Sequence, residues 1–189
     1  MSRENARRKN RTIDYPKMKM MKRPRHQARI VALQGLYERD IQGEACDESM
    51  PELLAPLLAE AELTGEPAKY SEILASGAWE KREQYDHTIA GASEHWDIER
   101  MAVVDRNILR LALYELIEQP DVPVRVVFDE AIELGRAFGS AETSQFINGV
   151  LDAIWKRDPA CQLAKTARAA TEKDSPERDP HKPHTQTTS

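Results

Sequence analysis

Apolar residues repeat at helical spacing in three successive segments between Val103 and Trp155. The first segment carries two adjacent apolar stripes, so a helix here is apolar over much of its circumference and packs on more than one side. We therefore expect it to be the central helix of the domain. The two stripes consist of Val104, Ile108, Leu111 and Ala112, and of Leu109, Leu113, Leu116 and Ile117.

Proline and glycine punctuate the other two segments. Pro120 ends the first helix, and Pro123 opens the second, where its fixed φ and missing N–H are tolerated. Gly139 ends the second helix, and Ser140 is the expected N-cap of the third. The stripes are Val127, Ala131, Leu134 and Phe138 in the second helix, and Ile147, Val150, Leu151 and Ile154 in the third.

One local signal conflicts with the third helix. Asn148-Gly149 is a common two-residue hairpin turn. Both flanks carry helical rather than alternating periodicity, so we expect a helix here. A glycine inside a helix costs about 1 kcal/mol relative to alanine. We therefore expect a neighbouring helix or a ligand to approach Gly149 closely.

Three more helices are expected upstream. The first begins near Pro24 and ends at Gly43, with Ile30, Leu33, Tyr37 and Ile41 on one face. Pro51 opens a leucine-rich second helix that the sequence Gly65-Glu66-Pro67 interrupts. A long third helix runs from about Lys69 to Glu94, and a short turn begins at Trp96-Asp97.

The two ends of the chain are polar and aperiodic, which is typical of disorder. We expect a disordered basic arm over residues 1–22, a helical domain over 23–157 and a disordered polar tail over 158–189. No run of alternating β-branched residues predicts a strand, so the fold class is all-α.

Charge is distributed unevenly along the chain. Residues 1–30 hold eleven Lys/Arg and two acids, a net +9, whereas the whole chain carries −5 and the remainder therefore −14. A basic arm on an acidic body indicates a polyanionic partner at one end. The acidic body in turn favours docking of a basic protein.

Arg25 and Arg29 fall in or near the first turns of the first helix, where positive charge is unfavourable in an isolated helix. The placement is explained if the free N–H groups and the arginines share a phosphate. The alternative is a solvated basic face that aids solubility. The density of positive charge beside this helix favours the phosphate interpretation.

We find no pattern for catalysis, a cofactor or a metal. A Gly-rich phosphate loop, a G-x-S-x-G elbow and a Glu-x-x-His pair are all lacking. Cys46 and Cys161 are far apart and are expected to be free thiols. No apolar run is long enough for a transmembrane span, and the basic N-terminus lacks a signal-peptide core, so we expect a cytoplasmic protein.

Four linked motifs follow one another along the chain: RHQARIVALQGLYERDIQG near the N-terminus, then ILRLALYEL, DVPVRVVFDEAIELGRAFG and FINGVLDAI. Together and in this order they resemble the NusB family of bacterial transcription antitermination factors. The resemblance implies about seven helices in two packed small bundles. It implies binding of single-stranded boxA-type RNA together with a small-subunit ribosomal protein (NusE), within the RNA polymerase antitermination complex. A homodimer is possible in such a family.

The resemblance also implies roles for individual residues. Arg23, Arg25 and Arg29 correspond to the family's RNA-binding basic region. Phe146 matches a base-stacking aromatic, with a core residue as the alternative, and Glu142 lies on the adjacent turn near the RNA face. Tyr37 and Asp105 match positions that face the ribosomal protein.

Two other functions stay open from the residues alone. One is a protein-interaction or assembly module whose arm binds polyanions generically. The other is a DNA-binding regulator, although no helix-turn-helix with a basic recognition helix is evident.

Overall fold

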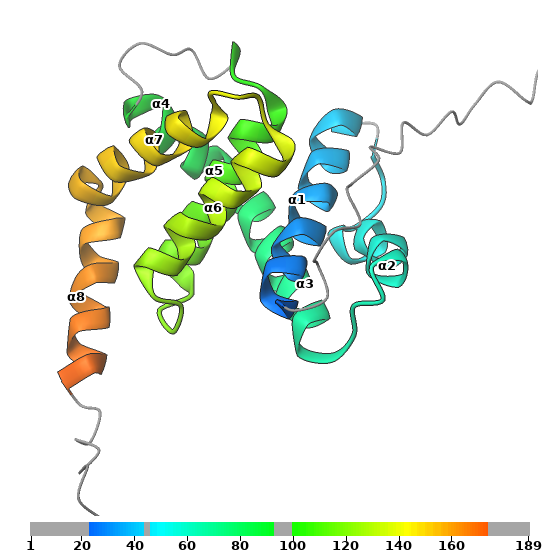
Figure 1. The fold of residues 1–189 in the computed structure, drawn as a ribbon, viewed down its shortest axis with the longest axis horizontal. Helices are drawn as coiled ribbons and strands as arrows, with labels where there is room; N and C mark the ends of the chain where they lie inside the picture. Colours follow the sequence, from blue (N-terminus) through cyan, green and yellow to red (C-terminus); the bar gives the residue numbers. More distant parts are fainter. Residues whose placement is uncertain (1–22, 44–45, 93–99, 174–189) are drawn as a thin grey trace, which may run out of the picture.

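The computed structural model describes residues 23–43, 46–92 and 100–173, and every regular element in these ranges is an α-helix. This confirms the all-α prediction. Figure 1 shows the arrangement of the helices. They are α1 (Pro24–Gln42), α2 (Met50–Glu60), α3 (Gly65–Glu80), α4 (Arg82–Ala92), α5 (Val103–Glu118), α6 (Val124–Phe138), α7 (Thr143–Arg157) and α8 (Pro159–Lys173).

Helix α5 is the centre of the fold, as its two apolar stripes predicted. It packs against α1, α3, α4, α6, α7 and α8. Ile108 of one stripe and Leu109 and Leu113 of the other are all fully buried. The helix therefore contributes to the core around most of its circumference, which explains why its sequence is apolar on more than one face.

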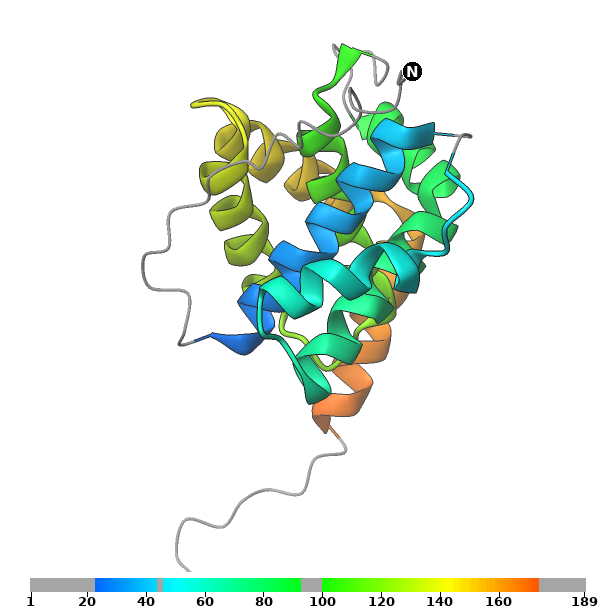
Figure 2. The same cartoon turned by 90° about the vertical axis from the view of Figure 1, so that its right-hand side faces the viewer.

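The helices fall into two groups that α5 joins. Helices α1, α2 and α3 pack on one another, whereas α4, α6, α7 and α8 pack around the other side of α5 (Figures 1 and 2). Gly77 lets α3 approach α5 closely, because a Cβ there would overlap the ring of Tyr114. The buried side chains of both groups form one continuous core.

The ends of α1 agree with the sequence. Pro24 occupies the first turn, and Gly43 follows the last residue with a φ of 57°, a conformation that glycine adopts without strain. Ile30 and Leu33 are buried as predicted, but Ile41 is 60% exposed. The apolar stripe of α1 therefore contributes to the core at Ile30 and Leu33 but not at Ile41.

The single long helix expected from Lys69 to Glu94 is instead two helices. Lys81 separates α3 from α4, and Arg82 donates a hydrogen bond to the carbonyl of Trp79 at the end of α3. Helix α3 packs on α1 and α5, whereas α4 packs on α5 and α7. The chain must therefore change direction, although no Pro or Gly marks the break.

The expected start of the C-terminal tail at residue 158 was also wrong. Pro159–Lys173 form α8, which packs on α5 and α7. Cys161 on this helix is fully buried, and Arg168 donates hydrogen bonds to the carbonyls of Leu116 (2.8 Å) and Gln119 (3.1 Å) at the end of α5. Within α5 the carbonyl of Leu116 would face Pro120, which has no N–H to donate, so α8 supplies its partner from outside. The expected arm over 1–22 and the residues beyond 173 lie outside the described ranges.

Three smaller observations complete the comparison with the sequence. Helix α7 begins at Thr143, with Glu142 rather than Ser140 at the N-cap position. Cys46 and Cys161 are free thiols, as predicted. Among the described residues, no helix is both long and apolar enough to cross a membrane.

Candidate nucleic-acid interface

The start of α1 presents two arginines to solvent. Arg23 precedes the helix and Arg25 lies in its first turn, and both are exposed. The guanidinium of Arg25 lies 4.5 Å from the centre of the Tyr70 ring, which contributes a cation–π attraction and holds the charge at the surface. This end of the helix is therefore a defined cationic site that directly follows the basic arm in sequence.

Unlike Arg23 and Arg25, Arg29 is buried. Its residue is only 2% exposed, and its guanidinium forms two hydrogen bonds with the carboxylate of Glu115 on α5. Tyr70 donates a hydrogen bond to the same carboxylate. The prediction that Arg29 neutralises a phosphate from the surface therefore conflicts with the structure. A buried guanidinium already paired to a carboxylate is unavailable to an external anion, so Arg29 joins α1 to α5 instead.

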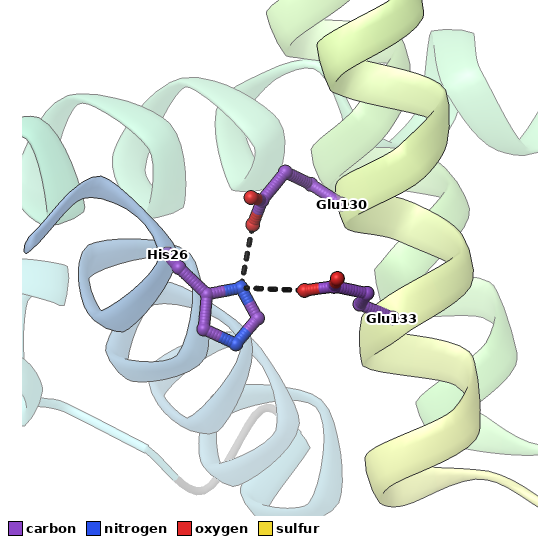
Figure 3. A group of neighbouring side chains, drawn as sticks. All are labelled: His26, Glu130 and Glu133. Atoms are coloured by element: carbon purple, nitrogen blue, oxygen red, sulfur yellow. Dashed lines mark hydrogen bonds and ion pairs between the residues drawn. The ribbon is translucent and has the colours of Figure 1, made fainter. Parts of the chain in front are cut away.

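Side chains of α6 face the start of α1. His26 Nδ1 lies 2.6 Å from Glu130 and 3.6 Å from Glu133 (Figure 3). Arg23 also pairs with Glu133, at 3.0 Å. Burial alone would raise the pKa of Glu130. The hydrogen bond with His26 and the charge of Arg29 more than offset this and lower that pKa below its usual value. Glu130 is thus held as a carboxylate between α1 and α6.

The second predicted RNA-binding group lies at the start of α7. Glu142 is exposed at the N-cap position. Phe146, one turn later, is half-buried and packs against the core. Phe146 therefore has at least part of the core role considered from the sequence, although it is not fully buried.

The two predicted partner-binding residues flank one ion pair. Arg106, next to Asp105 on α5, donates to Asp40 at 2.9 Å, and Asp40 lies three residues after Tyr37 on α1. Both Tyr37 and Asp105 are half-buried. Partial burial raises the pKa of Asp105, against the effect of a hydrogen bond from Thr143 at the start of α7. The structure therefore brings Asp105 beside the Glu142 turn.

The structure thus separates the predicted RNA-binding residues into two sites. In Figures 1 and 2 the start of α1 lies low in the view, and the turn between α6 and α7 lies at the top. Arg23 contacts the middle of α6 through Glu133, whereas Glu142 lies just beyond the end of α6. A ligand that touches both sites must follow α6, so an extended strand fits this arrangement.

Gly149 has no neighbour that explains it. No atom lies within 4 Å of the place where a Cβ would stand, so the expectation of a neighbouring helix was wrong. Gln145 and Asn148 are exposed on the same part of α7. Close approach of a ligand is the explanation that stays open, and the amide side chains beside Gly149 suit base edges.

Replacing Gly149 with alanine should separate these effects. We expect the free energy of unfolding to rise by about 0.5–1 kcal/mol, because alanine favours a helix and meets no steric obstacle here. RNA affinity should fall if the ligand backbone or a base passes over this position. Urea denaturation and RNA titration of the same variant measure both, and unchanged RNA affinity would remove Gly149 from the interface.

Sequence reasoning missed Tyr70, Glu130 and Glu133 as parts of this region. Their partners on α1 lie far away in sequence: His26 is 104 residues from Glu130, and Arg23 is 110 residues from Glu133. Tyr70 carried no local signal beyond an apolar position. A count of acids on the inner side of α6 could have indicated a cationic neighbour, but not which one.

Comparison with known proteins agrees with this fold. A model of the NusB family matches residues 26–156. The transcription antitermination protein NusB of Symbiobacterium thermophilum is 41% identical over 134 residues, covering 69% of this chain and 88% of that protein. NusB of Geobacter sulfurreducens is 43% identical over 131 residues, covering 69% and 92%.

Solved structures give the same result. T. maritima NusB superposes with a TM-score of 0.67 at 32% identity, covering 77% of this chain and 99% of that one. A chain from a crystal structure of antitermination factors NusB and NusE in complex with dsRNA superposes with a TM-score of 0.62 at 31% identity, covering 72% and 98%. Since the family model spans more than half of the sequence, this chain belongs to the NusB family.

Proposed function

We propose that this protein is an RNA-binding transcription antitermination factor. It binds boxA-type RNA of ribosomal RNA operon leaders together with the ribosomal protein NusE, as part of the RNA polymerase antitermination complex. The observation that carries the proposal is the exposed arginine pair at the start of α1, with Arg25 fixed on Tyr70, at the end of a strongly basic arm. The function is one of binding and assembly and requires no chemical step.

The two sites along α6 make different contacts with the RNA. Arg23, Arg25 and the basic arm neutralise phosphates and position the strand. At the other end of α6, the accessible part of Phe146 stacks on an unpaired base, and Glu142 accepts hydrogen bonds from base or sugar groups. Stacking on an aromatic contributes about 1–3 kcal/mol per base.

The partner surface lies beside the second RNA site. Tyr37 and Asp105 flank the Asp40–Arg106 ion pair, and Asp105 contacts Thr143 next to Glu142. The net charge of −14 outside residues 1–30 suits a basic ribosomal protein. Because partner and RNA would lie side by side, each can raise the effective concentration of the other. A structural relative that was solved in complex with NusE and dsRNA supports joint binding of a protein partner and RNA.

Replacing Arg25 with alanine should weaken boxA-type RNA binding by about three- to tenfold at about 0.1 M salt, because one phosphate contact is lost. The slope of log affinity against log salt should fall by about 0.7, the value for one phosphate of a single strand. Fluorescence anisotropy at several salt concentrations measures both. The matched control is Lys156→Ala, an exposed cation near the far end of α7 that should leave binding unchanged.

The same titration distinguishes the alternatives. A scrambled RNA and a DNA duplex should bind more weakly than the boxA-type RNA, and addition of NusE should increase the difference. Equal, salt-sensitive binding to all three nucleic acids would indicate a generic polyanion-binding arm. Preference for the duplex would indicate a DNA-binding regulator. An unchanged salt slope in Arg25→Ala would remove Arg25 from the phosphate-binding site.

A further inference from the structure

The cluster of His26, Glu130 and Glu133 joins α1 to α6 and has no part in the proposed RNA contacts. One ligand atom from each residue lies within 4.8 Å of the other two. Figure 3 shows the imidazole of His26 directed toward both carboxylates, which stand one turn apart on α6. We propose that this cluster is a binding site for a transition-metal dication of the Zn²⁺ type. The proposal does not depend on the RNA-binding function.

The separations between the ligand atoms suit a small tetrahedral ion. Zinc binds histidine nitrogen and carboxylate oxygen at about 2.0–2.2 Å, so two ligands of a tetrahedral site lie about 3.3–3.5 Å apart. His26 Nδ1 lies 2.6 Å from Glu130 Oε2 and 3.6 Å from Glu133 Oε2, values on either side of that range. Small side-chain rotations would therefore open the cluster for the ion, and water supplies the fourth ligand.

Charge in this region already attracts a cation. Three carboxylates, Glu115, Glu130 and Glu133, meet two guanidiniums, those of Arg29 and Arg23. Arg29 is buried against Glu115, so Arg23 is the cation that reaches Glu130 and Glu133 from solvent. Its side chain is 57% exposed and can leave the cluster without a change in the fold. A dication at the cluster would take the place of the Arg23 guanidinium.

The two carboxylate ligands differ in exposure, because Glu130 is nearly buried and Glu133 is accessible to solvent. The side chain of Glu130 is only 9% exposed, and Arg29 lies 3.6 Å from it on the inner side. The side chain of Glu133 is 38% exposed, which gives an ion and its water a path from solvent. The imidazole ligand favours zinc and its neighbours in the transition series over Mg²⁺ and Ca²⁺, which prefer oxygen ligands only.

The test is titration of the full chain with Zn²⁺, and with Co²⁺ as a spectroscopic probe of coordination geometry. We expect one site, at which Co²⁺ gives the visible absorption of a four- or five-coordinate ion. His26→Gln and Glu133→Gln should each weaken this site at least about tenfold, since each removes a ligand. Both residues lie at the surface of the α1–α6 contact, and thermal unfolding without metal checks that each variant folds.

Arg23→Gln provides the sharpest outcome, because it should strengthen metal binding by removing the competing cation. A merely structural ion-pair cluster predicts no such gain. The matched control is His87→Gln, an exposed histidine on α4 that should have no effect. Three results overturn the proposal: no binding by the wild-type chain, binding that persists in both His26→Gln and Glu133→Gln, or weaker binding in Arg23→Gln.

Discussion

Replacing Glu115 with alanine should lower the free energy of unfolding by about 3–5 kcal/mol, a large part of the stability of a domain this size. The carboxylate accepts hydrogen bonds from Arg29 on α1 and Tyr70 on α3, and its residue is only 1% exposed. Without it the Arg29 guanidinium stays buried, and Glu130, at 3.6 Å, is the one ion-pair partner left to it among the described residues. Urea denaturation followed by circular dichroism measures the loss.

The controls separate charge from packing. Tyr70→Phe removes one neutral donor and should cost only about 1–2 kcal/mol. The double variant Arg29→Met with Glu115→Leu should recover most of the stability, because a buried ion pair replaced by apolar side chains of similar volume is often neutral or better. If the double variant is as unstable as Glu115→Ala, lost packing rather than an uncompensated charge explains the effect.

This buried pair also shows where the sequence misled. Arg29 follows Arg25 by one helical turn and lies in the same basic segment, so local reasoning gave the two residues the same role. Their roles differ because Arg29 pairs with Glu115, which is 86 residues away in sequence. Periodicity reveals which face of a helix is apolar. It does not reveal which distant residue will pair with an arginine at the edge of that face.

Helices were predictable wherever apolar spacing and punctuation agreed. The spacing of Leu109 and Leu113, followed by Pro120, identified the central helix and its end. At Lys81 no Pro or Gly marks the break between α3 and α4. The break was not predicted, because tertiary packing alone requires it. Helix α8 was missed because the residues that repeat at helical spacing along it are mostly small alanines, although Cys161 and Arg168 attach it to the core.

The proposed metal site could not be predicted for the same reason. His26 has no other ligand nearby in sequence, because Glu130 lies 104 residues away. Only the packing of α1 beside α6 brings them together. The predicted RNA-binding residues, in contrast, came from family resemblance, and the structure places two of them, Arg25 and Phe146, on different helices.

Replacing Arg110 with alanine should destabilise the protein by about 2–4 kcal/mol, since three helices meet at this side chain. Its guanidinium donates to Asp86 on α4 at 2.5 and 2.6 Å and to Asp40 on α1 at 3.0 Å. The Arg110 side chain is only 4% exposed, so both carboxylates would lose a buried counter-charge. We place the loss slightly below that of Glu115→Ala because Asp86 is 28% exposed and water can reach it.

Arg106→Ala is the matched control for this prediction. Arg106 pairs with Asp40 alone and its side chain is 19% exposed, so its loss should cost about 1 kcal/mol. Arg110→Lys should recover little, because an ammonium cannot reproduce a planar fork that holds two carboxylates on different helices. If Arg110→Lys is as stable as the wild type, charge alone and not the guanidinium geometry joins the two helix groups. In that case the surface around Tyr37 and Asp105 would not depend on this network for its shape.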